Sequence, residues 1–131
     1  MLVVDSSVWI DYFNGKETPQ TLFLRDDAPR DQILVGDLIL CEVLQGFKHQ
    51  KHFENAKKLL FSFAYQDMAG SKIALKSAEN YRQLRSRGVT IRKTIDVIIA
   101  TFCIQNEHQL LHSDRDFDAI ETNLPLQVYH P

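Results

Sequence analysis

The sequence has few cysteines, no long apolar run and no basic excess. Cys41 and Cys103 lie in apolar segments without C-x-x-C spacing, so we expect buried free thiols in a reducing compartment, not a disulfide framework or a zinc site. No stretch approaches the roughly 20 apolar residues that span a bilayer. The start, Met-Leu-Val-Val-Asp, lacks the basic region of a signal peptide. These absences exclude a membrane protein and lead us to expect a cytoplasmic one.

The formal net charge is −2, so the basic excess that is common in nucleic-acid-binding proteins is absent. This counts mildly against a nucleic-acid substrate, although bound metal cations would offset a cluster of acids. The basic residues are also unevenly placed along the chain. Five of them fall in one short stretch: Arg82, Arg85, Arg87, Arg92 and Lys93.

Short apolar segments alternate with helical patterns, which predicts an α/β domain with a mainly parallel sheet. The expected strands cover residues 2–4, 33–35, 109–112 and 126–129. The expected helices cover residues 8–13, 19–25, 38–46, 52–63, 71–86 and 95–106, with Thr18, Asp37 and Thr94 among their N-caps. With 131 residues and no repeat or linker, we expect a single domain over residues 1–131.

Acidic residues occupy four sites where a core-building sequence would not place them. Asp5 ends the first expected strand, and Glu42 lies inside an apolar helix. Asp96 lies in the first turn of another apolar helix, and Asp114 and Asp116 directly follow the third expected strand. Ligands of an open parallel sheet bind outside the carboxyl ends of its strands. We therefore expect these acids to converge in one crevice at that edge.

Carboxylates gathered in one crevice repel one another, and a divalent cation would remove the conflict. Mg²⁺ or Mn²⁺ prefers hard oxygen ligands, takes few carboxylates directly and leaves room for a phosphate. Such an ion lowers the pKa of its bound water for in-line attack on phosphorus, and a free carboxylate can orient or deprotonate that water. No Ser–His or Cys–His motif and no glycine-rich nucleotide loop competes with this chemistry.

Each acid also has a purely structural interpretation. Asp5 could be a helix N-cap, Asp96 a first-turn acid favoured by the helix dipole, and the last two acids turn formers. Glu42 could face solvent or pair with Arg25 or Lys48. The functional interpretation therefore rests on the joint pattern and not on any single acid.

Four segments in this order resemble the PIN-domain family, specifically VapC-type toxins: LVVDSSVWIDYF, CEVLQG, TIDVIIA and LLHSDRDF. The resemblance covers essentially the whole chain. It implies a three-layer α/β/α fold with a mainly parallel central sheet. It also implies a Mg²⁺-dependent endoribonuclease, for which Mn²⁺ could substitute, that cuts tRNA, rRNA or mRNA. As the toxin of a toxin–antitoxin pair, such a protein inhibits translation and growth.

The resemblance also implies the site and the partners. Six residues would be catalytic: Asp5, Asp96, Glu42, Asp114, Asp116 and Ser7. The five acids among them would also be metal ligands. Asp5 and Asp96 would be the principal ligands, and the choice between Asp114 and Asp116 as the fourth acid stays open. Ser7 would support the first aspartate or the bound water. The partners would be a second copy, in a homodimer, and a cognate antitoxin whose C-terminal segment blocks the site in a heterotetramer or larger assembly.

Basic residues and one histidine flank the acids. Arg92 and Lys93 precede Asp96 by one helical turn and could hold an RNA backbone. The arginines of residues 82–87 could extend that track or simply form a solvated face. His112 could donate a proton to the leaving oxygen, but its place in an expected strand favours a structural role.

Three other functions remain to be compared with this one. A haloacid-dehalogenase-type phosphatase needs a second Asp two residues after its nucleophile, but Asp5 is followed by Ser6 and Ser7. A receiver-like signalling domain needs a phospho-acceptor Asp on a central strand, and none is evident. A non-catalytic PIN scaffold would bind RNA or a partner without cutting, and a metal-dependent cleavage assay separates it from the enzyme.

Overall fold

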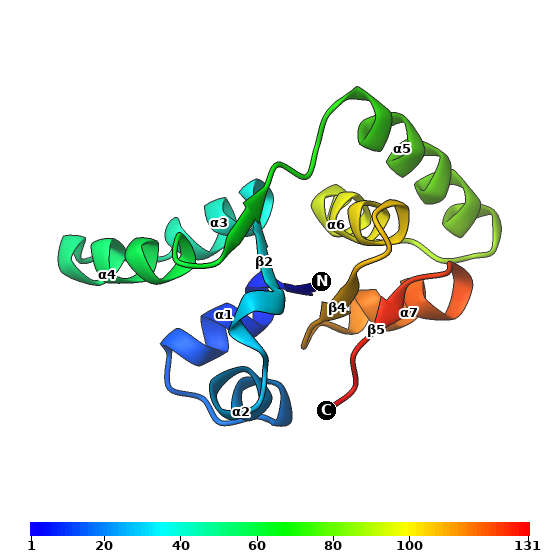
Figure 1. The fold of residues 1–131 in the computed structure, drawn as a ribbon. Helices are drawn as coiled ribbons and strands as arrows, with labels where there is room; N and C mark the ends of the chain where they lie inside the picture. Colours follow the sequence, from blue (N-terminus) through cyan, green and yellow to red (C-terminus); the bar gives the residue numbers. More distant parts are fainter.

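A five-stranded parallel sheet with helices on both faces forms the protein, in a computed structural model that describes residues 1–131 (Figure 1). The strands are β1 (Leu2–Val4), β2 (Ile33–Gly36), β3 (Ala64–Gln66), β4 (Gln109–Leu111) and β5 (Gln127–Val128). Their order is β3-β2-β1-β4-β5, and every neighbouring pair is parallel. The expectation of a three-layer α/β fold with a mainly parallel sheet is confirmed.

Seven helices cover the sheet. They are α1 (Ser6–Phe13), α2 (Pro19–Asp26), α3 (Asp37–Leu44), α4 (Gln50–Leu60), α5 (Ser71–Ser86), α6 (Thr94–Gln105) and α7 (Arg115–Asn123), with a short 3₁₀ turn η1 (Arg30–Gln32). Helices α1 to α4 gather on one side of the sheet and α5 to α7 on the other (Figure 1). None of the helices has the length and apolarity needed to span a lipid bilayer.

The central strand β1 is apolar along its whole length because both faces of the sheet are covered by helices. All three residues of β1 are buried, and Val4 pairs with Leu111 of β4. The Asp5 N–H then donates to the Leu111 carbonyl oxygen at 2.9 Å. This last contact places Asp5 and the first residues after β4 together at the carboxyl edge of the sheet.

One strand was not expected from the sequence. Helix α4 ends at Leu60, three residues before its expected end, and β3 follows as an edge strand beside β2. All three residues of β3 are exposed, so this strand carries neither an apolar run nor an alternating pattern. Its position comes from pairing with Leu34–Gly36, which are distant in sequence.

Two expected N-caps are displaced by one residue. Helix α3 is capped by Gly36 and α6 by Lys93, so Asp37 and Thr94 are the first helical residues and not the caps. The Asp37 carboxylate instead accepts from the Leu38 N–H at 2.9 Å and the Met68 N–H at 2.8 Å, and it thereby ties the segment after β3 to α3. The expected Thr18 cap of α2 is confirmed, with the Thr21 N–H donating to it at 3.0 Å.

Both cysteines are free, but only Cys103 is buried. Cys41 is exposed, so the expectation of two buried thiols is wrong for this residue. Helix α3 is apolar in composition but buries only Ile39 and Val43 fully. The apolar composition of the segment therefore did not reveal which side of the helix faces the core.

We expect Gly36→Ala to lower the free energy of unfolding by about 1–3 kcal/mol, as overpacking of a core commonly does. A Cβ atom at Gly36 would lie 2.2 Å from Cγ and Sδ of Met68, whose side chain is fully buried and cannot move away freely. Urea unfolding measures the change. Gly46→Ala is the matched control, because a Cβ there meets nothing closer than 3.6 Å. Equal stabilities of the two variants would contradict the packing described around Met68.

Candidate metal centre

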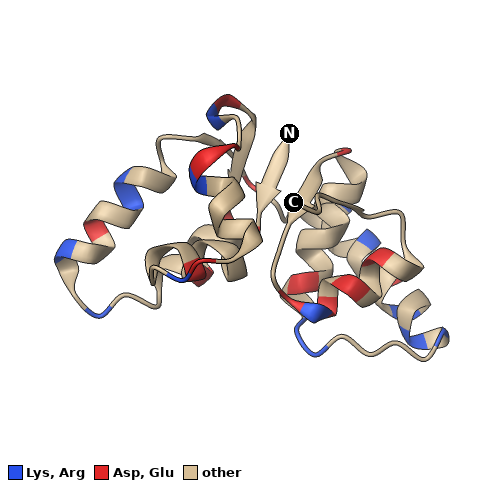
Figure 2. Cartoon of the chain, turned by 90° about the horizontal axis from the view of Figure 1, so that it is seen from below, with Lys and Arg blue, Asp and Glu red and all other residues tan.

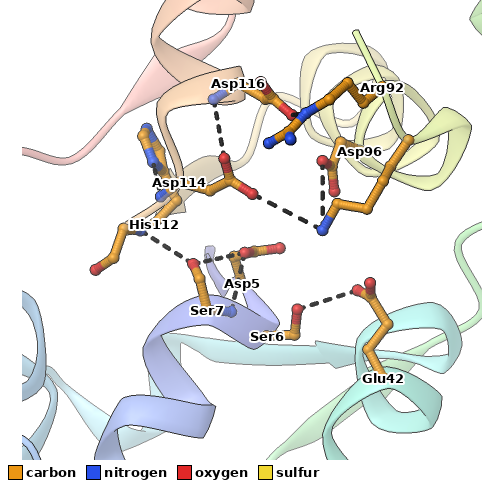
Figure 3. Close-up of polar contacts among 11 residues, drawn as sticks. Asp5, Ser6, Ser7, Glu42, Arg92, Asp96, His112, Asp114 and Asp116 are labelled. Atoms are coloured by element: carbon orange, nitrogen blue, oxygen red, sulfur yellow. Dashed lines mark hydrogen bonds and ion pairs between the residues drawn. The ribbon is translucent and has the colours of Figure 1, made fainter.

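Carboxylates from four parts of the chain meet at the carboxyl ends of β1 and β4 (Figure 3). Oxygen atoms of Asp96, Asp114 and Asp116 lie within 4.8 Å of one another. Asp5 and Glu42 are not part of this tightest group, but they face it from the other side in Figure 3. The expected convergence of the five acids is therefore present, with three of them closest together.

Asp5 both caps a helix and presents a free oxygen. Its Oδ2 accepts from the Ser7 N–H at 3.0 Å and from the Ser7 hydroxyl at 2.7 Å, which caps α1. Its Oδ1 is buried without a hydrogen-bond partner. Burial raises the pKa of Asp5, and the bonds from Ser7 only partly oppose that rise. The structural and functional interpretations of this residue are thus compatible.

Asp96 is a strongly perturbed carboxylate of the cluster. It lies in the first turn of α6, only 2% exposed, and its Oδ2 has no hydrogen-bond partner. Burial raises its pKa to about 7 against the opposing effect of Lys93, and the negative charges of Asp5, Asp114 and Glu42 raise it further. A buried carboxylate surrounded by like charges needs a cation to be ionised at low cost.

The turn after β4 contributes two acids with different local roles. Asp114 caps α7, because its Oδ1 accepts from the Asp116 N–H at 2.9 Å, and its Oδ2 remains available. Asp116 lies in the first turn of α7, with a buried Oδ2 that has no hydrogen-bond partner. Both carboxylates border the same space as Asp96. The geometry therefore keeps both as candidate ligands.

Glu42 is half-buried on α3, and the Ser6 hydroxyl donates to its Oε1 at 3.1 Å. It does not pair with Arg25, whose guanidinium contacts Asp26 and Glu17, or with Lys48. Burial raises the pKa of Glu42, and the charge of Asp5 adds to that effect. Ser6 is not among the residues predicted for the site from the sequence. The only signal for it was its place directly after Asp5, because its partner lies 36 residues away.

Ser7 connects the two halves of the site. Its hydroxyl donates to Asp5 Oδ2 at 2.7 Å and accepts from the Ser113 N–H at 3.0 Å. The second bond joins the start of α1 to the segment that follows β4. The position of the Ser7 side chain is thus suited to holding the Asp5 carboxylate in one orientation.

Two cationic side chains lie against the acids. Lys93 Nζ is 3.8 Å from Oδ2 of both Asp96 and Asp114, and Arg92 Nε is 4.0 Å from Asp116 Oδ2. Elsewhere, lysines and arginines are spread over several elements and do not form one basic face (Figure 2). Arg87, for example, donates to the carbonyl oxygen of Asn123 at 2.6 Å and fastens the end of α5 to α7. That contact gives Arg87 a structural role.

His112 turns away from the acidic cluster. Its Nδ1 accepts from the Asp114 N–H at 3.2 Å, so the proton of the neutral ring is on Nε2, 3.8 Å from Asp118 Oδ1. Burial lowers the pKa of this histidine, which keeps the ring neutral. A neutral, buried imidazole that accepts at the start of α7 supports the structural role expected for it.

The donor set fits a hard divalent cation. Three buried oxygens lack a hydrogen-bond partner, namely those of Asp5 (Oδ1), Asp96 (Oδ2) and Asp116 (Oδ2). Unpaired buried carboxylate oxygens are costly unless a cation compensates them. Oxygen ligands without nitrogen or sulfur are those that Mg²⁺ and Mn²⁺ prefer. A surface pocket of about 570 Å³ lies at the opposite edge of the sheet beside Met1 and Gln109, and none of these acids lines it.

Comparison with known proteins gives relatives of similar length. Ribonuclease VapC11 of Mycobacterium tuberculosis is 27% identical over 132 residues, with 98% of this chain and 97% of the relative covered. The crystal structure of FitAcB from Neisseria gonorrhoeae matches with a TM-score of 0.80 at 14% identity, covering 100% of this chain and 98% of that one. A toxin–antitoxin complex from Klebsiella pneumoniae matches with a TM-score of 0.75 at 19% identity, covering 100% and 98%.

The two structural matches show that the fold is shared, since their sequence identities are low. The sequence provides the family assignment independently, because the PIN domain model matches residues 2–123. That range contains β1 to β4 and every acid of the cluster. The chain belongs to the PIN-domain family.

Proposed function

We propose that residues 1–131 form a single domain that is a metal-dependent endoribonuclease, hydrolysing phosphodiester bonds of RNA with Mg²⁺, or Mn²⁺ in its place. The observation that carries this proposal is the set of unpartnered carboxylate oxygens buried at the carboxyl edge of the sheet. The name of the curated relative, a ribonuclease, supports RNA as the substrate. Transfer, ribosomal and messenger RNA are all candidate substrates.

The residues of the site have different roles in this proposal. Asp5 and Asp96, with Asp114 or Asp116, would hold the cation, while Ser7 keeps the Asp5 carboxylate in place. When bound, such a cation would supply an activated water and stabilise negative charge on the phosphoryl group. The Glu42 carboxylate, whose Oε1 accepts from the Ser6 hydroxyl, would orient the attacking water or accept its proton.

The basic residues bordering the acids position the substrate in this proposal. Arg92 and Lys93 are exposed at the start of α6, directly beside the carboxylates. Their cations can contact phosphates on either side of the bond that is cut. They would contact the RNA backbone and not its bases, so these two residues add affinity without sequence selectivity.

We further propose that the protein is the toxin of a toxin–antitoxin pair and inhibits translation and growth by cutting RNA in the cytoplasm. The relative's name and the matching toxin–antitoxin complex from Klebsiella pneumoniae support this. The partners are then a cognate antitoxin, whose C-terminal segment blocks the site, and a second copy of the chain. The assembly would be a homodimer of the toxin, and a heterotetramer or larger complex with the antitoxin.

Brief induction of the protein in bacteria tests the proposal. We expect growth arrest and new RNA 5′ ends with the wild-type chain, and neither with Asp5→Asn, which removes one charge from the cluster. Co-expression of the cognate antitoxin should restore growth. Asp31→Asn, at an exposed acid in η1, is the control and should behave as wild type. Identical 5′ ends with wild type and Asp5→Asn would show that the cluster is not the nuclease centre.

A further inference from the structure

Lys93 occupies an unusual position between two acids of the cluster. Its Nζ is 3.8 Å from Asp96 Oδ2 and equally 3.8 Å from Asp114 Oδ2. The other oxygen of Asp114 already caps α7, and Asp96 Oδ2 has no hydrogen bond. The ammonium therefore lies beside the same two oxygens that remain available to a cation.

Local helix energetics do not account for a lysine here. Lys93 is the N-cap of α6, and its side chain forms no capping hydrogen bond. Serine, threonine, aspartate and asparagine are favoured at this position, and a positive charge is unfavourable at the amino end of a helix dipole. The favourable contacts of this side chain are its two ion pairs with the acids.

The backbone at Lys93 is held, whereas the side chain can move. The Asp96 N–H donates to the Lys93 carbonyl oxygen at 3.1 Å, which anchors the residue at the start of α6. The side chain is 53% exposed, compared with 3% for Asp96. Its flexible four-carbon stem can carry the ammonium into solvent without disturbing the carboxylates.

We infer that the Lys93 ammonium is the counter-ion of the metal-free site and is exchanged for the divalent cation. This rests on the proposed function. One ammonium compensates the cluster incompletely, because Asp5, Glu42 and Asp116 also lie around it. A doubly charged ion compensates the cluster better, and the two cations exclude each other at the same oxygens. Lys93 withdraws to the rim, where it is free to bind an RNA phosphate.

The exchange has a measurable consequence for metal affinity. Lys93→Gln removes the competing cation, so Mn²⁺ should bind about three- to tenfold more tightly, the range that two partly exposed ion pairs supply. The same variant should melt at a lower temperature than wild type without metal at pH 8, because Asp96 and Asp114 then lose their ion pairs with Lys93. Titration of the full chain with Mn²⁺ alone, followed by the electron paramagnetic resonance of the free ion, measures the affinity without RNA.

Lys72→Gln is the matched control. Lys72 is exposed on α5 and forms no ion pair, so this variant changes the net charge equally at a distance from the cluster. Mn²⁺ binding by Lys93→Gln that is no tighter than binding by Lys72→Gln would overturn the exchange and leave the nuclease proposal standing. Failure of the wild-type chain to bind Mn²⁺ at all would instead overturn the metal-dependent function itself.

Discussion

Asp96→Asn should abolish RNA cleavage by the purified protein, lowering the rate at least about 100-fold, because the outer partners of metal ligands already contribute about 10- to 100-fold and a direct ligand should contribute more. Asp96 is the most buried acid of the tightest group, and its Oδ2 has no hydrogen-bond donor in the protein. An amide at this position carries no charge and binds a divalent cation weakly. Cleavage of a labelled RNA in Mg²⁺ measures the effect.

The same substitution should stabilise the metal-free fold. The pKa of Asp96 is raised to about 7 by burial and neighbouring acids, so ionising it in the folded protein is unfavourable. Removing that charge should raise the free energy of unfolding by about 1–3 kcal/mol at pH 8. Loss of activity together with a gain of stability separates a functional defect from an unfolded variant. Asp31→Asn should change neither quantity, and a stable Asp96→Asn variant that cuts RNA at the wild-type rate would remove Asp96 from the mechanism.

Mg²⁺ should stabilise the protein far more at pH 8 than at pH 5.5. Asp5, Glu42 and Asp96 have raised pKa values, so the metal-free folded chain binds protons that the unfolded chain releases. Their contribution to stability is complete below the unfolded pKa values near 4, and for Asp96 it is lost as the pH rises through about 7. Mg²⁺ binds the ionised carboxylates and offsets this loss. At about 100 times its dissociation constant it contributes about 2.7 kcal/mol.

Unfolding in urea with EDTA or Mg²⁺, at both pH values, measures this difference. His108 and His112 change the stability in the opposite direction. Burial lowers their pKa values, so their contribution to the free energy of unfolding is lost as the pH falls below about 6.5. Both histidines are unchanged in Asp96→Asn. Subtracting the unfolding free energy of that variant from that of the wild type, at each pH, therefore removes the effect of the histidines. We expect most of the Mg²⁺ stabilisation to disappear in Asp96→Asn. An equal Mg²⁺ effect at pH 5.5 and pH 8 would mean that the ion does not bind these carboxylates.

Much of the fold could be predicted from local patterns. The apolar runs of β1, β2 and β4 and the apolar segment of α6 correspond to segments that are largely buried. Helix α5 has its expected bounds, although only Ser77, Asn80 and Leu84 of it are buried. Exposed β3 has no such pattern, because only its pairing with β2 makes it a strand. The burial of Cys41 was mispredicted for a related reason, since composition does not show which side of α3 meets the core.

For the candidate site, Asp5, Asp114 and Asp116 could be placed at the carboxyl edge of the sheet from the sequence alone, because an acid that follows a buried parallel strand emerges there. Glu42 and Asp96 lie on helices, and their approach to this edge depends on how α3 and α6 pack. Which carboxylate oxygens already accept hydrogen bonds is set by the folded chain. The contacts from Ser6 to Glu42 and from Ser113 to Ser7 join residues 36 and 106 positions apart. Hydrogen bonds and burial between such distant segments set how far each charge is compensated, and no local pattern contains that information.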